Sequence, residues 1–192
     1  NMKHIYIIAE IGCNHCGDYD LAKKMVDEAK NCGVDAVKFQ TFKAAELISR
    51  YAPKADYQKI TTGNDENQLE MTRKLELPYD EFIKLRDYAI SLGLETFSTP
   101  FDMDSIDFLE KNGQTIWKIP SGEVTNLPFL ERIAKFKVAG KKIILSTGMC
   151  TVEEIHQAVD IICKYEDSSN LIILHCNTEY PTPDIDVNLS AI

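Results

Sequence analysis

Residues Ile116–Glu123 read IWKIPSGE, an apolar run that ends in turn residues. Lys118 stands inside the apolar run, and Ser121 and Glu123 stand at its exit. A charged lysine is costly to bury unless an anion accompanies it. The stretch therefore predicts a buried strand whose carboxyl end carries reactive side chains.

The same arrangement of an apolar run followed by polar groups recurs along the whole chain. We expect further strands at residues Ile5–Ala9, Val34–Phe39, Leu94–Phe97, Lys142–Leu145 and Leu171–Leu174. Helical spacing of apolar residues predicts helices at Asp18–Cys32, Asp80–Leu92, Asp104–Lys111, Leu127–Phe136 and from Thr151, in a capping box with Glu154, to about Tyr165. Strands and helices that alternate in this way predict a parallel sheet with right-handed crossovers.

Two architectures suit this alternation, an open doubly wound sheet and a (β/α)8 TIM barrel. No G-x-G-x-x-G motif follows the first strand, whereas every strand ends in polar groups. That distribution favours an α/β TIM barrel, whose site is collected from all strand ends. The sequence supplies about six β/α units, so we expect an incomplete barrel whose edge strands pair with further strands or with another copy.

A long insertion, Lys43–Pro78, separates the second strand from its helix. Short helices are predicted at Ala44–Leu47 and Gln68–Leu75, around a polar centre at Thr61–Asp65. An ordered insertion of this length favours a functional role or a subunit contact.

Length, charge and cysteine content indicate which classes of protein and partner fit this chain. The 192 residues suffice for one domain, and the net charge of −9 argues against nucleic acid or an anionic membrane as the main partner. No apolar run approaches the roughly 20 residues of a membrane span. The six cysteines are scattered, which is typical of reduced thiols in a cytoplasmic protein. Cys13 and Cys16 form a C-x-x-C pair without a second pair, so we interpret them as incidental thiols.

The strand-end residues predict chemistry on a small anion. They are Glu10, Asn14, His15, Lys38, Gln40, Ser98, Thr99, Lys118, Ser121, Glu123, Ser146, Thr147, His175, Asn177, Thr178 and Tyr180. Lysines and hydroxyls suit a phosphate or carboxylate, and a carboxylate suits proton transfer. Alternatively, Lys38 or Lys118 forms a Schiff base, as in class I aldolases. Each lysine could also simply be ion-paired, and the Ser-Thr pairs could cap helices.

Six motifs, in order along the chain, resemble the sialic acid synthase family, which comprises N-acetylneuraminate, legionaminic acid and pseudaminic acid synthases. They are Ala9–His15 (AEIGCNH), Val37–Thr41 (VKFQT), Ser98–Phe101 (STPF), Lys118–Glu123 (KIPSGE), Leu145–Met149 (LSTGM) and His175–Pro181 (HCNTEYP). The resemblance implies a metal-assisted condensation of phosphoenolpyruvate with N-acetylmannosamine, which gives N-acetylneuraminate and phosphate. Its alternative is a legionaminic acid synthase, which acts on 2,4-diacetamido-2,4,6-trideoxymannose.

The resemblance also implies roles for individual residues. Glu10, Lys38 and Lys118 are the implied catalytic residues. The implied phosphoenolpyruvate contacts are Lys38, Thr99, Lys118 and Ser121, and the implied sugar contacts are Gln40, Glu123, Thr178 and Tyr180.

What lies outside these motifs follows from the same resemblance. The family's divalent metal, Mn²⁺ or Mg²⁺, is expected on histidines of a seventh and an eighth strand, so we expect no metal ligand in residues 1–192. We interpret residues 1–192 as the N-terminal synthase domain, without the family's C-terminal antifreeze-like domain. The full-length enzyme is expected to be a cytoplasmic homodimer. A different class of function also fits, an inactive or self-associating fragment that binds anions.

Overall fold

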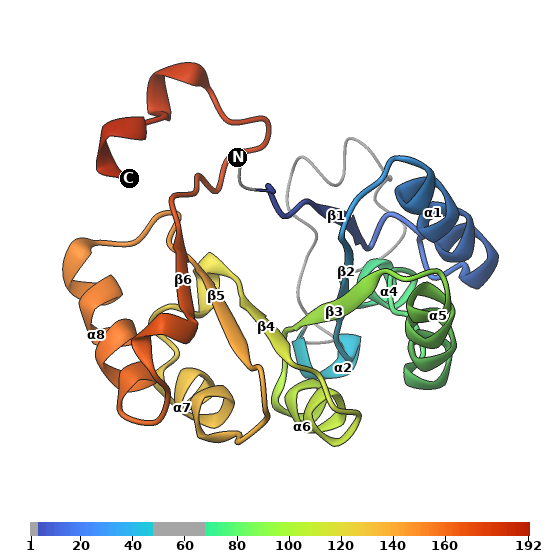
Figure 1. The fold of residues 1–192 in the computed structure, drawn as a ribbon, viewed down its shortest axis with the longest axis horizontal. Coiled ribbons are helices and arrows are strands. Elements are labelled where there is room, and N and C mark those ends of the chain that lie inside the picture. Colours follow the sequence, from blue (N-terminus) through green and yellow to red (C-terminus); the bar gives the residue numbers. More distant parts are fainter. Residues whose placement is uncertain (1–3, 48–67) are drawn as a thin grey trace. The chain divides into compact units, whose positions relative to one another are not determined.

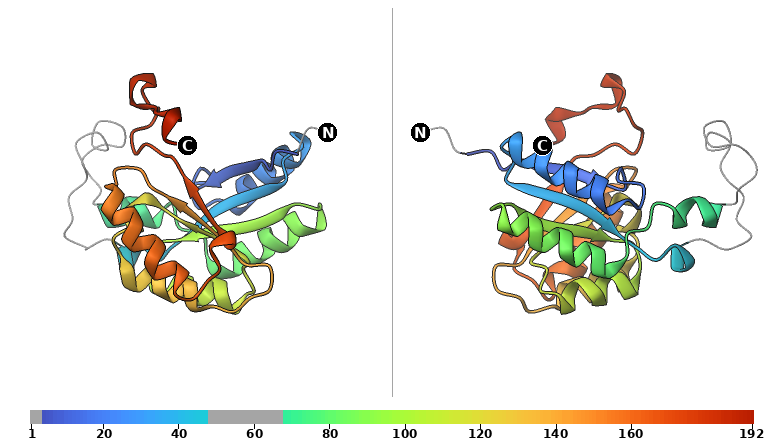
Figure 2. Two further views of the ribbon diagram at one scale, coloured as in Figure 1. Left: turned by 60° about the vertical axis from the view of Figure 1, so that its left-hand side comes forward. Right: turned by 90° about the vertical axis from the view of Figure 1, so that its right-hand side faces the viewer.

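The computed structural model of the chain describes residues 4–47 and 68–192. It divides into two compact units, Asn1–Leu109 and Glu110–Ile192, and each unit holds one three-stranded sheet. Figures 1 and 2 show the strands and helices of both units.

The first unit is built on strands β1 (Ile8–Gly12), β2 (Ala36–Thr41) and β3 (Glu95–Pro100), which lie parallel in the order β1-β2-β3. Its helices are α1 (Tyr19–Asn31), α2 (Ala44–Leu47), α4 (Gln68–Arg73), α5 (Tyr79–Ser91) and α6 (Met103–Lys111), the last of which crosses the boundary between the units. Helices α1 and α5 pack side by side on one face of this sheet (Figure 1).

Apolar side chains fill the space between the first sheet and its helices. Ala22 and Val26 of α1 and Leu85 of α5 are fully buried. The rings of Phe39 on β2 and Phe82 on α5 meet edge to face, with their centroids 5.8 Å apart. This core holds the strands that carry the first set of candidate residues.

The second unit repeats the plan with strands β4 (Ile116–Ile119), β5 (Lys142–Ser146) and β6 (Leu171–Leu174), parallel and in the order β4-β5-β6. Helices α7 (Leu127–Lys135) and α8 (Val152–Cys163) pack against each other, and short 3₁₀ turns lie at Ser121–Glu123, Ser168–Asn170, Asp184–Asp186 and Leu189–Ala191. The segment after β6 extends away from the second sheet (Figure 1).

Local signals in the sequence account for the helix starts. The side chain of Asp18 accepts a hydrogen bond from the Leu21 amide at the start of α1. Thr151 and Glu154 form the predicted capping box at the start of α8. These caps satisfy backbone amides that the first turn of a helix leaves without partners.

The structure confirms the predicted alternation of parallel strands and helices, but several boundaries differ. The predicted strand Ile5–Ala9 starts three residues too early and stops three residues short, because β1 lies at Ile8–Gly12. Ile5 is 77% exposed, and the Ile7 amide donates to the Asp35 carboxylate instead of joining the ladder. The start of the apolar run therefore only leads into the strand, whereas Ile8, Ala9 and Glu10 all belong to β1.

Other boundaries move by a few residues. β2, β3 and β5 continue to Thr41, Pro100 and Ser146, beyond their predicted ends, and α8 ends at Cys163. Polar residues prolong these strands because their backbone groups still join the parallel ladders. The predicted polar centre Thr61–Asp65 lies outside the described residues.

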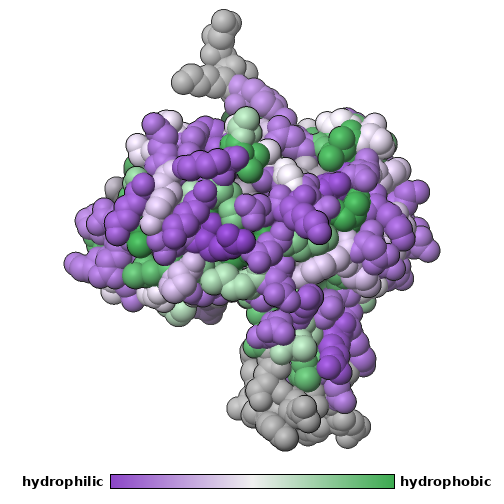
Figure 3. Space-filling view, turned by 90° about the horizontal axis from the view of Figure 1, so that it is seen from below, coloured by the Kyte–Doolittle hydropathy of each residue, from purple (hydrophilic) through white to green (hydrophobic). Residues whose placement is uncertain are grey.

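Figure 3 shows a face on which hydrophilic residues predominate and hydrophobic ones form only small groups. In residues 4–47 and 68–192, no helix has both the length and the apolar character needed to cross a bilayer.

Candidate active site

Strand register places four of the predicted residues on one face of the first sheet. Glu10 pairs with Lys38 across β1 and β2, and Gln40 pairs with Thr99 across β2 and β3. Because side chains alternate along a strand, Lys38 and Gln40 point to the same face, and their register partners point there too. Phe39, between them, points to the helices and packs on Phe82.

Glu10, Lys38, Gln40 and Thr99 form a first set of candidate residues, and Lys38 is at its centre. Its Nζ forms an ion pair with Glu10 Oε2 and donates a hydrogen bond of 3.5 Å to Thr99 Oγ1. The Lys38 side chain is 16% exposed, whereas that of Glu10 is 42% exposed. The charge of a mostly buried ammonium group is therefore balanced by a carboxylate that solvent or a ligand can reach.

Gly12 and Cys13 lie beside this set at the end of β1. Gly12 has φ +56°, and a Cβ atom there would lie 2.9 Å from Glu10 Oε1 and 3.4 Å from Gln40 Nε2. Cys13 Sγ donates to Gln40 Oε1 at 3.0 Å. Burial and then the nearby Glu10 carboxylate raise the pKa of Cys13 to about 11. The thiol therefore keeps its proton at neutral pH and acts as a hydrogen-bond donor.

Buried polar groups next to the first set form hydrogen bonds with one another or with the backbone. Thr41 and Ser98 share a buried hydrogen bond of 2.6 Å on the helix side of the sheet. His15 is 1% exposed, and its Nδ1 accepts a hydrogen bond from the Gly17 amide at 3.0 Å. Burial lowers the pKa of His15, so its ring is neutral at neutral pH. His15 therefore shapes the turn after β1.

Lys118 is the centre of a second set in the second unit, which also comprises Ser121 and Ser146. Its Nζ donates to Ser146 Oγ at 2.6 Å and to the Ile119 carbonyl at 3.0 Å. Lys118 pairs in register with Ile144, and Ser146 lies two residues further along β5, on the same face. The ammonium group is thus held at the carboxyl end of β4.

Gly148 brings Ser121 into the second set. The Gly148 amide donates to Ser121 Oγ at 2.9 Å, so the hydroxyl proton of Ser121 is left to point elsewhere. A Cβ atom on Gly148 would lie 3.0 Å from Thr178 Cγ2 and 3.1 Å from Ser121 Oγ. A side chain at this position would therefore force Thr178 or Ser121 to move by a few tenths of an ångström.

The remaining predicted sugar contacts are less enclosed. Glu123 accepts a 2.7 Å hydrogen bond from Asn126 Nδ2, which fixes it in the turn after β4. Tyr180 is 88% exposed, and Thr178 is also exposed, with its methyl group close to Gly148. Their sugar-binding roles stay predictions.

The sequence predicted no individual role for three residues that shape the two sets: Gly12, Ser146 and Gly148. All three stand inside the quoted motifs, so the signal was available. Ser146 had been noted only as a strand-end hydroxyl, and the glycines have no side chain to suggest chemistry. Their parts follow from hydrogen bonds and close approaches that only coordinates reveal.

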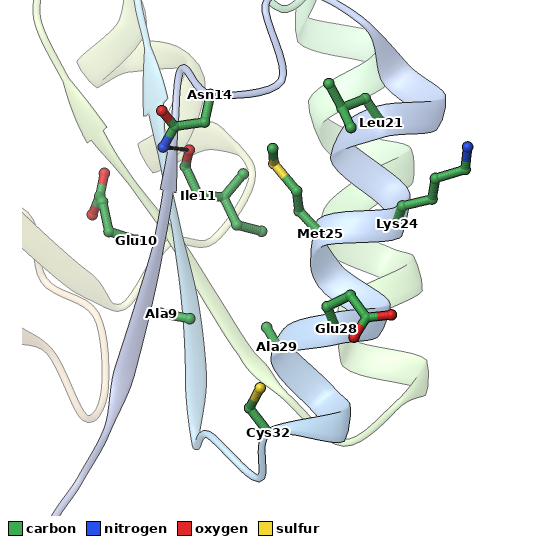
Figure 4. Close-up of a pocket in the computed structure, with 10 residues that line it drawn as sticks. All are labelled: Ala9, Glu10, Ile11, Asn14, Leu21, Lys24, Met25, Glu28, Ala29 and Cys32. Carbon is green, nitrogen blue, oxygen red and sulfur yellow. Dashed lines mark hydrogen bonds between the residues drawn. The ribbon is translucent and has the colours of Figure 1, made fainter.

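A groove of about 530 Å³ lies between β1 and α1. Figure 4 shows Ile11 pointing from β1 toward Met25 of α1, while Glu10 points to the opposite side of the strand. The groove is mostly apolar, with Lys24 and Glu28 at its helix side. It is therefore distinct from the polar face that holds Lys38.

The expected divalent metal has no ligand cluster in the described ranges. No three His, Cys, Asp or Glu side chains gather there in a way that could hold an ion. His175 Nε2 accepts a hydrogen bond from the Asn188 amide at 3.3 Å. The described residues thus do not fit a metal centre of their own.

The profile of the NeuB family matches residues 25–192. The chain belongs to the NeuB family. It is 50% identical to the N,N'-diacetyllegionaminic acid synthase of Campylobacter jejuni, over all of this chain and 57% of that protein. It is 34% identical to the N-acetylneuraminate-9-phosphate synthase of Homo sapiens, over 97% of this chain and 50% of that protein. The chain thus spans about half the length of these relatives.

A solved NeuB-type structure confirms the fold. The N-acetylneuraminic acid synthetase of Leptospira borgpetersenii, in complex with citrate, matches 99% of this chain and 60% of its own, with a TM-score of 0.81 and 34% identity. The six β/α units expected from the sequence therefore match the fold of that structure.

Proposed function

We propose that this chain is the phosphoenolpyruvate-binding part of an N,N'-diacetyllegionaminic acid synthase. The observation that carries the proposal is 50% identity to an enzyme of that name, against 34% to the human N-acetylneuraminate-9-phosphate synthase. The motifs alone favoured N-acetylmannosamine as the sugar. The difference in identity instead supports 2,4-diacetamido-2,4,6-trideoxymannose, the alternative in the sequence analysis.

In the proposed reaction, C3 of phosphoenolpyruvate forms a bond to the aldehyde carbon of the open-chain sugar, whose oxygen takes up a proton. Water then adds to C2 of the resulting cation and loses a proton. Finally the C2–O bond to phosphate breaks, so that inorganic phosphate leaves and C2 becomes a ketone. Every atom of the water and of both substrates is retained in the keto acid and the phosphate.

The first set supplies charge and a proton acceptor for this reaction. Lys38 is mostly buried and already binds a carboxylate, so it suits a phosphate or carboxylate group of the substrate. Glu10 is the more exposed partner and suits the handling of water or a proton. Thr99 Oγ1, 3.5 Å from Lys38 Nζ, supplies a hydroxyl for the same substrate.

The second set supplies oriented donors. Ser146 fixes the Lys118 ammonium group, and the Gly148 amide fixes Ser121 Oγ so that its O–H is free to donate to an anion. Donors that are already oriented lose little freedom when charge develops on the substrate, which is the basis of electrostatic catalysis. Glu123, Thr178, Tyr180 and Gln40 are the proposed sugar contacts.

The decisive experiment measures phosphate release by the full-length protein that carries this chain. Phosphoenolpyruvate, Mn²⁺ or Mg²⁺ and one sugar at a time are supplied. We expect a higher kcat/KM with 2,4-diacetamido-2,4,6-trideoxymannose than with N-acetylmannosamine. The reverse preference would make the enzyme an N-acetylneuraminate synthase, and no phosphate release with either sugar would refute the proposal.

Two further assays test the alternative aldolase mechanism and the expected oligomeric state. Borohydride reduction with pyruvate traps a Schiff base on Lys38 or Lys118 only if the aldolase mechanism operates. Size-exclusion chromatography of the full-length protein tests the expected homodimer. An adduct on either lysine would overturn the proposed mechanism.

A further inference from the structure

We propose that Cys13 is a positioning residue for the sugar substrate, whose thiol fixes the side-chain amide of Gln40. The inference rests on the proposed function, because it assigns Gln40 to the sugar. It adds a residue that the motif roles leave out and that the sequence analysis interpreted as an incidental thiol.

The thiol of Cys13 is half-buried and stands 3.0 Å from Gln40 Oε1, with Sγ as the donor. Since a protonated thiol can donate one hydrogen bond, this contact uses the only proton that Cys13 has. The Gln40 carbonyl oxygen is thereby turned toward the Cys13 turn, and the amide nitrogen must point the other way.

The NH2 group of the Gln40 amide faces the side of the first set that holds Glu10. Gln40 Nε2 lies 3.4 Å and Glu10 Oε1 lies 2.9 Å from the position that a Cβ of Gly12 would occupy. Gly12 therefore opens the space that both groups share. Within residues 4–47 and 68–192, the Gln40 NH2 group makes no hydrogen bond.

An unpaired NH2 group next to a carboxylate suits a ligand that offers both kinds of hydrogen bond. A sugar hydroxyl or an acetamido carbonyl can accept from Gln40 Nε2, and a neighbouring hydroxyl can donate to Glu10. A glutamine side chain that rotated freely would present its oxygen or its nitrogen at this point. The Cys13 thiol removes that ambiguity and so favours an acceptor on the sugar.

The test replaces Cys13 in the full-length protein by Val, which is similar in size and cannot donate, and by Ser, which can. We expect Cys13→Val to raise the KM for the sugar roughly threefold to tenfold, as for the loss of one hydrogen bond. The KM for phosphoenolpyruvate should change little, and Cys13→Ser should restore most of the sugar affinity. Cys16→Ala, in the same turn, is the matched control and should leave both constants unchanged.

A double-mutant cycle tests whether Cys13 acts through Gln40. In a Gln40→Leu background, Cys13→Val should have no further effect on the KM for the sugar. Additive effects would overturn the inference, as would equal changes in both KM values or a Cys13→Ser variant no better than Cys13→Val. If Gln40→Leu leaves the sugar KM unchanged while phosphate is still released, the inference fails and the proposed function survives.

A spectroscopic measurement keeps the inference testable if the enzyme releases no phosphate at all. The Raman S–H stretching band of Cys13 is isolated by subtracting the spectrum of Cys13→Val from that of the unmodified protein. We expect this band at the low frequency of a strongly hydrogen-bonded thiol, moving upward in Gln40→Leu. A band unaffected by Gln40→Leu would refute the contact on which the proposal depends.

Discussion

Lys141 in the second unit and Lys38 in the first are both lysines with little exposure, but their surroundings differ. Lys141 is 2% exposed, and its Nζ donates to the carbonyls of Ile133, Ala134 and Phe136 at the end of α7. It also pairs with Glu166 at 2.9 Å. The N–H groups of the Lys141 ammonium group are all bound within the protein, so Lys141 stabilises the carboxyl end of α7.

Among the described residues, Lys38 is held only by side chains, one of them a carboxylate that remains partly exposed. A buried lysine is therefore not in itself a sign of a site. What separates the two is their place in the fold. Lys141 lies just before β5, whereas Lys38 lies on β2 near its carboxyl end, where parallel α/β folds bind ligands.

The largest effect is expected from Lys141→Met. The change leaves three helix-end carbonyls and the Glu166 carboxylate without their cation, and loss of one partner of a buried pair costs about 3–5 kcal/mol. Denaturant unfolding of the two proteins measures it. Lys135→Met, which breaks a surface pair with Glu131, is the control and should cost less than about 1 kcal/mol. Equal losses from the two variants would contradict the assignment of Lys141.

Lys38→Met should have the opposite profile, with a large effect on activity and a small one on folding. We expect kcat/KM for phosphoenolpyruvate to fall on the order of 10²–10³-fold, as for other removed electrostatic donors. Steady-state kinetics of the full-length protein measures it. Lys84→Met, on the exposed face of α5, serves as the control. A Lys38 variant with normal kinetics would show that its ion pair is only structural.

Gly148→Ala tests the close approach in the second set. An added methyl group would press on Thr178 and Ser121, so we expect the KM for phosphoenolpyruvate to rise about tenfold while the unfolding midpoint changes little. Gly122→Ala is the matched control, because a methyl group there meets open space. The same loss of affinity in both variants would refute the steric argument.

The smallest effect concerns pH. Desolvation opposes ionisation of Glu166, but the hydrogen bond from Lys141 and those from Asn170 and the Asp167 amide keep the pKa of Glu166 below its usual value. Ionised Glu166 therefore contributes fully to the free energy of unfolding above pH 4.5, the ordinary pKa of glutamate. This contribution is lost as the pH falls through the lower pKa that Glu166 has in the folded protein. Glu166→Gln should therefore flatten the decline of stability on acidification. An unchanged acid-unfolding curve would contradict this.

The sequence predicted the six parallel strands and their helices well, because hydrophobic periodicity and helix caps are local signals. It placed the first strand too early, because an apolar run such as Ile5–Ile8 does not reveal which backbone groups find a ladder partner. It also predicted the lysines and hydroxyls of both sets from their strand-end positions.

The partners of those residues could not be read from the sequence. Whether Lys118 binds Ser146, or Cys13 binds Gln40, depends on register and on backbone approach at Gly148 and Gly12. Lys141 illustrates the reverse case. Its carbonyl partners are backbone atoms five to eight residues away along the chain, so no pattern of side chains in the sequence predicts them.

The register of β2 has a consequence for folding. Lys38 and Gln40 alternate with Val37 and Phe39, which pack toward the helices. A slip of one residue would send the Lys38 ammonium group into the apolar layer around Phe82 and expose Phe39 on the polar face. Burial of an unpaired charge makes that arrangement far less stable than the native one. The residues proposed to bind substrate therefore also disfavour a misaligned sheet while the chain folds.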